Sequence, residues 1–283
     1  MLGSFLRFAE SDIHVSLRAE QVTTLGPLKV TNAMIYGLIC AVLISVIMIA
    51  ARRRIKVEPR KGWGQIIEVI IEYVLNMLEG VFGSRAKAVQ YAPIFGTFFM
   101  FILLNNTLGL LPVVGPQVSV VYAGEHVPLL RPFTADLNGT IAMAVTAIVF
   151  VQILSIKAQG GKKHLQHYFT NKPLNPLNMF IGLLEVFGEF TRILSLSLRL
   201  FLNTAVGEIL VAVFTSLVIS NGRTPLAVIP IIMFEILVAG IQAYVFTVLT
   251  ATYLGLAIAH AEDHGHEDVH ETMTAKKVEA GTT

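Results

Sequence analysis

Charged residues are scarce in this sequence. They make up 14% of its 283 residues, whereas about a quarter of an ordinary soluble domain is charged. A soluble surface with so little charge would aggregate. The net charge of +2 is too small to favour a polyanionic partner, so we expect no nucleic acid. Because 54% of the residues are hydrophobic, the composition also excludes a disordered chain.

Cysteine is nearly absent as well, since Cys40 is the single one and lies in an apolar run. One cysteine excludes an intrachain disulfide scaffold and leaves the redox compartment undecided. The sequence has no glycine-rich phosphate loop, so we expect no direct nucleotide binding and no bound cofactor. The class that remains is a polytopic membrane protein.

The sequence is poor in charged residues but contains several long hydrophobic runs. A spanning helix needs about 20 apolar residues to cross about 30 Å of hydrocarbon. We predict an all-α protein with one integral membrane domain, 32–261, and five crossings at 32–51, 93–111, 137–156, 179–219 and 225–260. Each of the last two would be about 60 Å long as a helix. We therefore expect a tilted, antiparallel pair.

Lysine and arginine orient the chain, because they gather on the cytoplasmic side of membrane proteins. Fourteen lie in 52–92, 157–178 and 262–283, against five in the alternate connecting segments. We therefore expect an external N-terminal segment, 1–31, and a polar cytoplasmic tail, 262–283, which we expect to be disordered. Residues 112–136 contain four prolines and are expected to form an external loop. The first span is too long for a cleavable signal peptide.

Residues 62–83 form a different kind of segment. Glu68, Glu72, Asn76 and Glu79 make one polar stripe on a helix that otherwise consists mainly of apolar residues. This pattern predicts an amphipathic helix that lies at the inner membrane interface. An aqueous charged face is the simplest interpretation of its glutamates.

The two long spans contain ionisable residues, which are costly in a bilayer and are therefore candidates for function. Because successive residues of a helix are rotated by about 100°, the ionisable residues of the fourth span can be assigned to faces of the helix. Arg199 shares one stripe with Glu185, Arg192 and Asn203, and Glu189 flanks it. Glu208 points to the opposite side of the helix. The fifth span contributes Glu235 and Gln242, which share a face.

Depth gives a second ordering of these residues. Glu208 and Glu235 each lie about ten residues, roughly 15 Å, from the turn at 219–224. Two carboxylates at one level on antiparallel helices could share or relay a proton through water. Arg199 and Gln242 are expected to meet near the middle of the membrane. Glu185, Glu189 and Arg192 lie nearer the cytoplasmic side.

The two arginines of the fourth span differ in their local partners. Arg199 has no acid at i±3 or i±4, so its partner is either another subunit or a carboxylate elsewhere in the bundle. Arg192 has Glu189 at i−3 and Glu185 at i−7. These acids could satisfy it within its own helix, so for Arg192 a structural ion pair and a functional role both stay open.

These residues carry a resemblance. Residues 195–203 read Ser-Leu-Ser-Leu-Arg-Leu-Phe-Leu-Asn, and 205–208 read Ala-Val-Gly-Glu. This run resembles the signature of subunit a of F-type ATP synthases. Similar segments are Phe234-Glu235-Ile236, Gln242-Ala243, Phe246 and Tyr253 downstream, and Asn105-Asn106, 109–112 and 135–138 upstream. The resemblance covers roughly residues 30–260.

The resemblance implies a proton-translocating stator subunit that is not itself catalytic. Arg199 would face the rotating c-ring between two aqueous half-channels, and would drive rotation of the ring during ATP synthesis. The polar positions along the proton paths would be Asn203, Glu208, Glu235, Gln242 and Glu185. Possible inner-path or structural positions are Glu189, Arg192, Asn106, Asp136 and Asn138. The chain departs from the family in having glutamate at both outer positions and Leu202 in place of a usual glycine.

The implied partners are the c-ring, the b-type subunits of the peripheral stalk, the rest of the complex and membrane lipid. Because the chain has no Arg/Ser-rich presequence, a bacterial plasma (inner) membrane is favoured over an organelle inner membrane.

Two other classes of function predict different sequence features. A secondary ion-coupled transporter with a midplane charged site predicts inverted repeats and broken helices, and the sequence has neither. An enzyme would need a metal or a catalytic constellation. His260, His264, His266 and His270 have i, i+4 spacings, but a solvated tail explains them better than a metal site, so we expect no metal.

Overall fold

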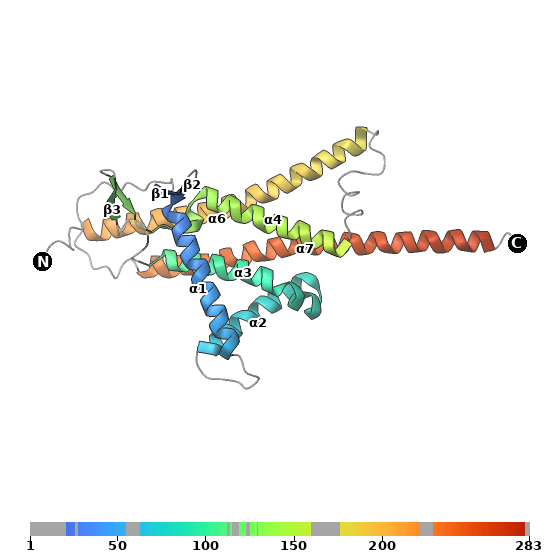
Figure 1. The fold of residues 1–283 in the computed structure, drawn as a ribbon, viewed down its shortest axis with the longest axis horizontal. Coiled ribbons are helices and arrows are strands. Elements are labelled where there is room, and N and C mark those ends of the chain that lie inside the picture. Colours follow the sequence, from blue (N-terminus) through green and yellow to red (C-terminus); the bar gives the residue numbers. More distant parts are fainter. Residues whose placement is uncertain are drawn as a thin grey trace. The chain divides into compact units, whose positions relative to one another are not determined.

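The fold is built mainly from long helices (Figure 1). The computed structural model describes residues 21–25, 28–54, 63–111, 114, 119–122, 125–128, 130–159, 176–220 and 229–280. In these ranges the helices are α1 (Asn32–Arg54), α2 (Trp63–Phe82), α3 (Arg85–Gly109), α4 (Leu137–Gln159), α6 (Pro176–Ser220) and α7 (Ile229–Ala280). All of them except α2 contain a stretch long and apolar enough to cross a membrane, which gives the five spans expected from the sequence.

Helix α3 begins earlier than the sequence predicts. We expected a span at 93–111 from the extent of its apolar run. The structure instead starts the helix at Arg85 and places Pro93 inside it. The Thr97 hydroxyl donates to the Pro93 carbonyl at 2.6 Å, one turn back on the same helix.

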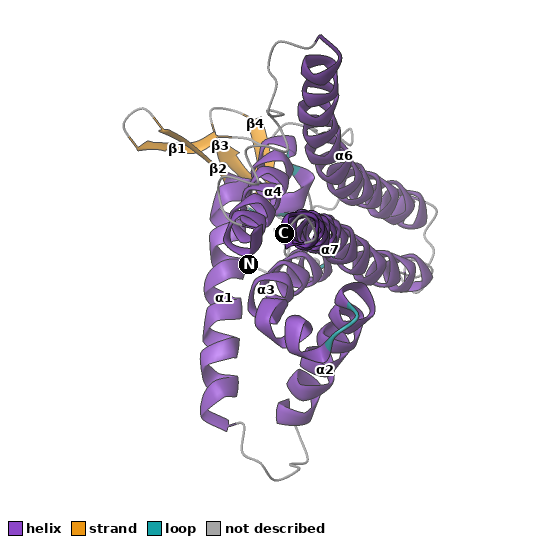
Figure 2. Ribbon diagram, turned by 90° about the vertical axis from the view of Figure 1, so that its right-hand side faces the viewer, coloured by secondary structure: helices purple, strands orange, loops and turns teal. Residues whose placement is uncertain are grey.

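Two short hairpins add strands to the expected all-α fold (Figure 2). Strand β1 (Gln21–Leu25) pairs antiparallel with β2 (Leu28–Thr31), and β3 (Ser119–Tyr122) pairs antiparallel with β4 (Glu125–Pro128). They fall in the expected N-terminal segment and in the expected proline-rich loop. The valines and threonines of these runs favour strands, but four or five residues are too few for the sequence pattern to distinguish a strand from a loop.

The chain divides into two compact units. Unit 1 consists of residues 1–50, 100–140 and 198–243, and unit 2 of residues 51–99, 141–197 and 244–283. In unit 1, Tyr36 and Cys40 of α1 pack with Val114 and with neighbouring apolar side chains. The Tyr36 hydroxyl donates to the backbone carbonyl of Asn105 at 3.2 Å, which joins α1 to α3.

Unit 2 packs around aromatic side chains of α3. Phe98 contacts Phe150 of α4 and Phe246 of α7, and Phe95 contacts Phe82 of α2. The turn from α2 to α3 uses Gly83, whose φ of 66° suits glycine. The Gly83 amide donates to the Glu79 carbonyl at 2.8 Å and closes the end of α2.

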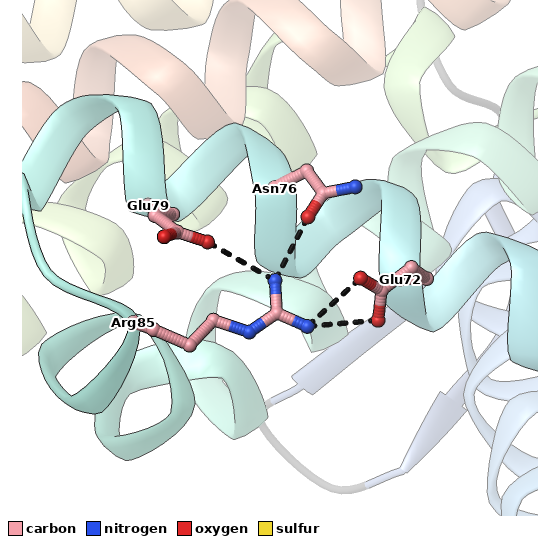
Figure 3. A network of polar contacts seen from close by, with 4 residues as sticks. All are labelled: Glu72, Asn76, Glu79 and Arg85. Carbon is pink, nitrogen blue, oxygen red and sulfur yellow. Dashed lines mark hydrogen bonds and ion pairs between the residues drawn. The ribbon is translucent and has the colours of Figure 1, made fainter.

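The polar stripe of α2 converges on Arg85, the first residue of α3 (Figure 3). The Arg85 guanidinium binds Glu72 at 2.8 Å, Asn76 at 2.8 Å and Glu79 at 3.2 Å. Three residues of the stripe therefore hold α2 against α3, in addition to facing solvent. Glu68 is exposed. The placement of α2 at a membrane interface stays a prediction.

The C-terminal tail differs from the expectation of disorder, because α7 continues to Ala280. The tail contains four glutamates, two lysines and two alanines, which have high helix propensity, so a polar composition did not exclude a helix. The side chains of the tail histidines lie outside those that the structure describes, and their solvated state stays a prediction.

Candidate functional site

Helix α6 is continuous from Pro176 to Ser220, so the rotation derived from the sequence applies along its length. The Arg199 side chain is exposed, whereas Glu208 is half-buried. Among the residues that the structure describes, none forms a hydrogen bond or an ion pair with Arg199. No carboxylate of the described bundle therefore satisfies this cation.

Exposed apolar side chains follow Arg199 along α6 and also occur on α7. Leu202 and Val206 on the same helix have 53% and 55% of their surface exposed. On α7, Met233, Leu237 and Ile241 are exposed to a similar extent. An arginine within such an apolar surface is unfavourable in lipid unless a partner covers it.

A pocket in unit 1 contains both outer glutamates. Its lining comes from the end of α3, from α6, from α7 and from the segment before α4: Asn106, Gly109, Leu110, Pro132, Asn203, Thr204, Gly207, Glu208, Glu235 and Ala239. The space open to the centres of water molecules is about 30 Å³. Since one water needs about 10–15 Å³ on this measure, the pocket has room for about two waters.

The glutamates that the sequence places at one level thus line the same pocket. Glu235 reaches across to α6 at Gly207, the residue before Glu208. A Cβ atom at Gly207 would lie 2.5 Å from the Glu235 Oε2 atom and 3.0 Å from its Cδ atom. The absence of a side chain at Gly207 is therefore what admits the Glu235 carboxylate.

Arg131 is the site residue that sequence reasoning missed. We counted it as an external cation, but its side chain is only 4% exposed and its Nη2 atom lies 3.5 Å from Oε2 of Glu208. The signal was its position next to Pro132 and shortly before the matched segment 135–138. A residue before proline is held in extended backbone, which favours a fixed direction for its side chain.

A buried network of amides and hydroxyls adjoins this pocket. The Thr134 hydroxyl lies 2.6 Å from Asn106 Oδ1 and 3.1 Å from Asn105 Oδ1. Thr204 of α6 donates to the same Asn106 oxygen at 3.5 Å. The amide nitrogens of Asn105 and Asn106 are buried and have no hydrogen-bond partner among the described residues. Buried polar atoms of this kind are suited to bind water.

Asp136 and Asn138 have a local structural role. Asp136 Oδ1 accepts hydrogen bonds from the Asn138 backbone N–H at 3.1 Å and from its side-chain amide at 3.3 Å. This is an N-cap at the start of α4. Gln242 is buried, and its amide nitrogen has no partner among the described residues. Although it was expected at the level of Arg199, the two form no hydrogen bond.

The inner charged group lies in unit 2. Arg192 Nη1 is 2.6 Å from Glu189 Oε1, one turn back on α6. The Arg192 guanidinium also lies 4.8 Å from the ring centre of Tyr253 on α7, a cation–π contact. These contacts support the structural interpretation of Arg192. One of its two partners, Tyr253, belongs to the fifth span. Glu185 is half-buried on the same helix.

Comparison with known proteins identifies the family. The family model described as ATP synthase A chain matches residues 34–255, which is most of the chain. The chain belongs to the ATP synthase subunit a family. It is thus an integral membrane protein that takes part in ATP synthesis and proton transport as a non-catalytic subunit of the synthase.

Relatives in this family cover most of the chain. ATP synthase subunit a of Moorella thermoacetica is 31% identical over 250 residues, which span 88% of this chain and 99% of that one. The corresponding protein of Nitrosospira multiformis is 29% identical, over 88% and 91% of the two chains. ATP synthase subunit a 2 of Chlorobaculum tepidum is 31% identical, and the match spans 85% of this chain but 66% of that longer protein.

Proposed function

We propose that this chain is the stator subunit that conducts protons past a rotating ring of c subunits, with Arg199 between two aqueous half-channels. The observation that carries the proposal is the exposed Arg199 side chain, without a described partner, within an apolar surface of α6. A cation at such a position needs a carboxylate from outside the described part of the chain. A ring of rotor carboxylates supplies that partner repeatedly.

The mechanism follows from the fixed charge. A protonated rotor carboxyl is neutral and can face lipid, whereas the cation of Arg199 stabilises its ionised form at close approach. The released proton leaves by the inner path, and a new one enters by the outer path. The same cation opposes direct proton passage between the paths. One charge that crosses 100 mV contributes about 2.3 kcal/mol, so several protons must pass for each ATP.

The outer half-channel is proposed to run through the pocket around Glu208 and Glu235. Room for about two waters and the adjoining amides of Asn106 and Asn203 support this assignment. On the inner side we propose Glu185 as the acid of the exit path, with Gln242 deeper in the membrane. The contacts of Glu189 and Arg192 favour a structural role for that pair.

The remaining parts of the assignment rest on charge distribution and on the family. We propose an external N-terminus, a cytoplasmic C-terminus and a bacterial plasma membrane as the location. The expected partners are the c-ring and the b-type subunits of a peripheral stalk. A secondary transporter is the alternative, and the uninterrupted helices α6 and α7 give it no support because such transporters use broken helices.

The test is Arg199→Ala in the complete synthase. We expect ATP synthesis driven by a proton gradient to fall by at least about 100-fold, because a preorganised charge is removed. The c-ring should still co-purify. The matched control is Arg85→Ala, which removes an arginine whose described partners lie in α2. Synthesis near the parental rate in an assembled Arg199→Ala complex would contradict the proposal.

A further inference from the structure

We propose that Thr134 fixes the direction of the Asn106 amide, so that Asn106 turns its NH₂ group to the outer pocket and donates a hydrogen bond to a water molecule there. This water passes protons to the glutamates of the pocket. The inference rests on the proposed function, because it assigns a proton-relay water to the outer half-channel. Thr134 acts through Asn106 and is therefore a positioning residue.

The first observation is the hydrogen bond to the Asn106 oxygen. The Thr134 hydroxyl lies 2.6 Å from Asn106 Oδ1, a distance typical of a strong O–H···O bond. The Thr204 hydroxyl reaches the same oxygen only at 3.5 Å, and it lies 3.0 Å from the Leu200 carbonyl of its own helix. A hydroxyl has one proton to donate, so that of Thr204 is drawn mainly to Leu200. Thr134 is therefore the main described donor to Asn106.

The Thr134 hydroxyl also has a second acceptor within reach. It lies 3.1 Å from Asn105 Oδ1. That oxygen, however, already accepts the Thr134 backbone N–H at 3.4 Å. The single hydroxyl proton therefore serves the closer oxygen, which belongs to Asn106. Asn105 is bonded to the backbone of Thr134, and Asn106 to its side chain.

The second observation is that Thr134 is held by packed backbone. It is fully buried in the 3-10 turn that precedes α4. Just before it, Pro132 lies so close to Gly109 of α3 that a Cβ atom there would be 2.7 Å from the proline ring. The Phe133 ring packs over Gly37 of α1. The Thr134 hydroxyl thus has a fixed origin and can hold the amide in one direction.

The third observation is the nitrogen end of the same amide. Asn106 lines the pocket with only 7% of its surface exposed, and its Nδ2 atom is buried with no hydrogen-bond partner among the described residues. Because the oxygen end is bonded to Thr134, the NH₂ group is the polar end that Asn106 has left for the pocket. A buried donor without a partner is unfavourable. The pocket has room for about two waters, and one of them satisfies this donor.

This direction of the amide suits proton uptake. Uptake needs an ionised carboxylate at the start of the step, and Glu208 and Glu235 both line the pocket. An amide oxygen turned to the pocket would repel an ionised carboxylate. A water that accepts an N–H bond from Asn106 can instead point its own O–H groups at the carboxylate, and it keeps a lone pair for another proton.

The proton step follows from this geometry. A hydronium that enters the pocket transfers one proton to the remaining lone pair of the held water and becomes a water molecule itself. The held water passes one of its own protons to the ionised carboxylate, which becomes a neutral carboxyl group. The held water therefore has as many protons after the step as before it. The amide of Asn106 loses and gains no proton, so it is ready for the next step.

The experiment compares Thr134→Val with Thr134→Ser in the complete synthase in membrane vesicles. ATP synthesis driven by an imposed proton gradient is measured per assembled complex, and co-purification of the c-ring reports assembly. Thr134→Val removes the hydroxyl and should lower the rate by about tenfold, the scale of one hydrogen bond that acts on a charged group. Thr134→Ser keeps the hydroxyl and should stay near the parental rate. Thr146→Val is the matched control, because the exposed Thr146 hydroxyl donates to the Ala142 carbonyl of its own helix.

Two further measurements test whether Thr134 acts through Asn106 and on a proton step. Asn106→Leu should also lower the rate by about tenfold, and adding Thr134→Val to it should lower the rate little further, because the coupled pair is already broken. Heavy water should slow Thr134→Val more than the parent, because proton uptake then limits the rate. If Thr134→Val does not assemble, Thr134→Cys takes its place. A thiol is a weak donor, so this variant should be slower than Thr134→Ser.

Other outcomes separate this inference from the proposed function. A parental rate in Thr134→Val would overturn the role of Thr134, and so would losses that multiply in the double variant or an unchanged response to heavy water. Equal rates in Thr134→Cys and Thr134→Ser would do the same. In those cases slow synthesis in an assembled Glu235→Gln variant would leave the outer half-channel standing. If assembled Glu235→Gln works at the parental rate, the outer half-channel itself is wrong, and the relay water with it.

Discussion

The outer and inner charged groups both include residues of α6 and contact α7, but their charged side chains have different kinds of partner. At the inner group, Arg192 pairs with Glu189 on its own helix and stacks on Tyr253 of α7. At the outer group, Glu208 depends on Arg131 from a distant segment, and Glu235 faces a pocket with no described ionic partner. The inner charges are locally satisfied, whereas one outer charge is free to change. Proton uptake suits the second arrangement.

The largest expected effect compares lysine substitutions at the two arginines of α6. Arg199→Lys should lower ATP synthesis by on the order of 100-fold, because the compact ammonium lacks the planar fork of a guanidinium. Arg192→Lys should keep most of the rate, since the lysine ammonium can still pair with Glu189 and make a cation–π contact with Tyr253. If ATP synthesis fell equally in the two assembled variants, the assignment of Arg199 as functional and Arg192 as structural would be wrong.

A middle-sized effect is expected at Gly207, over which the Glu235 carboxylate lies. Gly207→Ala would push the Glu235 carboxylate out of its position, and we expect conduction to fall by roughly tenfold, less than for loss of the carboxyl. Gly188→Ala is the matched control on α6, because a Cβ atom there meets nothing within 4 Å. Conduction that is equally unaffected in both variants would count against a role for the Glu235 position.

The smallest effect is expected at Tyr253. Tyr253→Leu removes the ring beneath Arg192 and should lower the free energy of unfolding by about 0.5–1 kcal/mol. Tyr253→Phe keeps the ring and should lose less. Thermal unfolding of the purified membrane sector measures both. Proton conduction should change little in either variant, and a large fall in conduction with unchanged stability would place Tyr253 in the exit path instead.

The sequence predicts much of the scaffold because membrane spans need long apolar runs. The five spans, the continuity of α6 and the shared pocket of Glu208 and Glu235 all follow from run length and from the regular rotation of a helix. Arg131 could not be predicted in this way. Its burial depends on Pro132 and on contacts with α1 and α3, whereas counting positive charge treats every loop arginine as solvated.

The same limit explains the other differences. Arg85, the first residue of α3, binds Glu72, Asn76 and Glu79, which belong to another helix. The stripe on α2 identified these three residues, but nothing in its spacing identified the cation that they bind. A local sequence pattern predicts a helix or a strand. The side-chain contacts between two helices become known only from the structure.

The uninterrupted length of α6 has a mechanical consequence. Its 45 residues correspond to about 68 Å of helical rise at 1.5 Å per residue, and Arg199 lies on the helix between Arg192 and Thr204. On the proposed function, the rotor exerts a sideways force at Arg199 with every step. The helix is fastened to α7 by the Arg192–Tyr253 contact on one side of that point, and to α3 and Arg131 by Thr204 and Glu208 on the other. On that proposal, contacts on both sides of Arg199 along the chain would hold α6 more firmly against this force than contacts on one side alone.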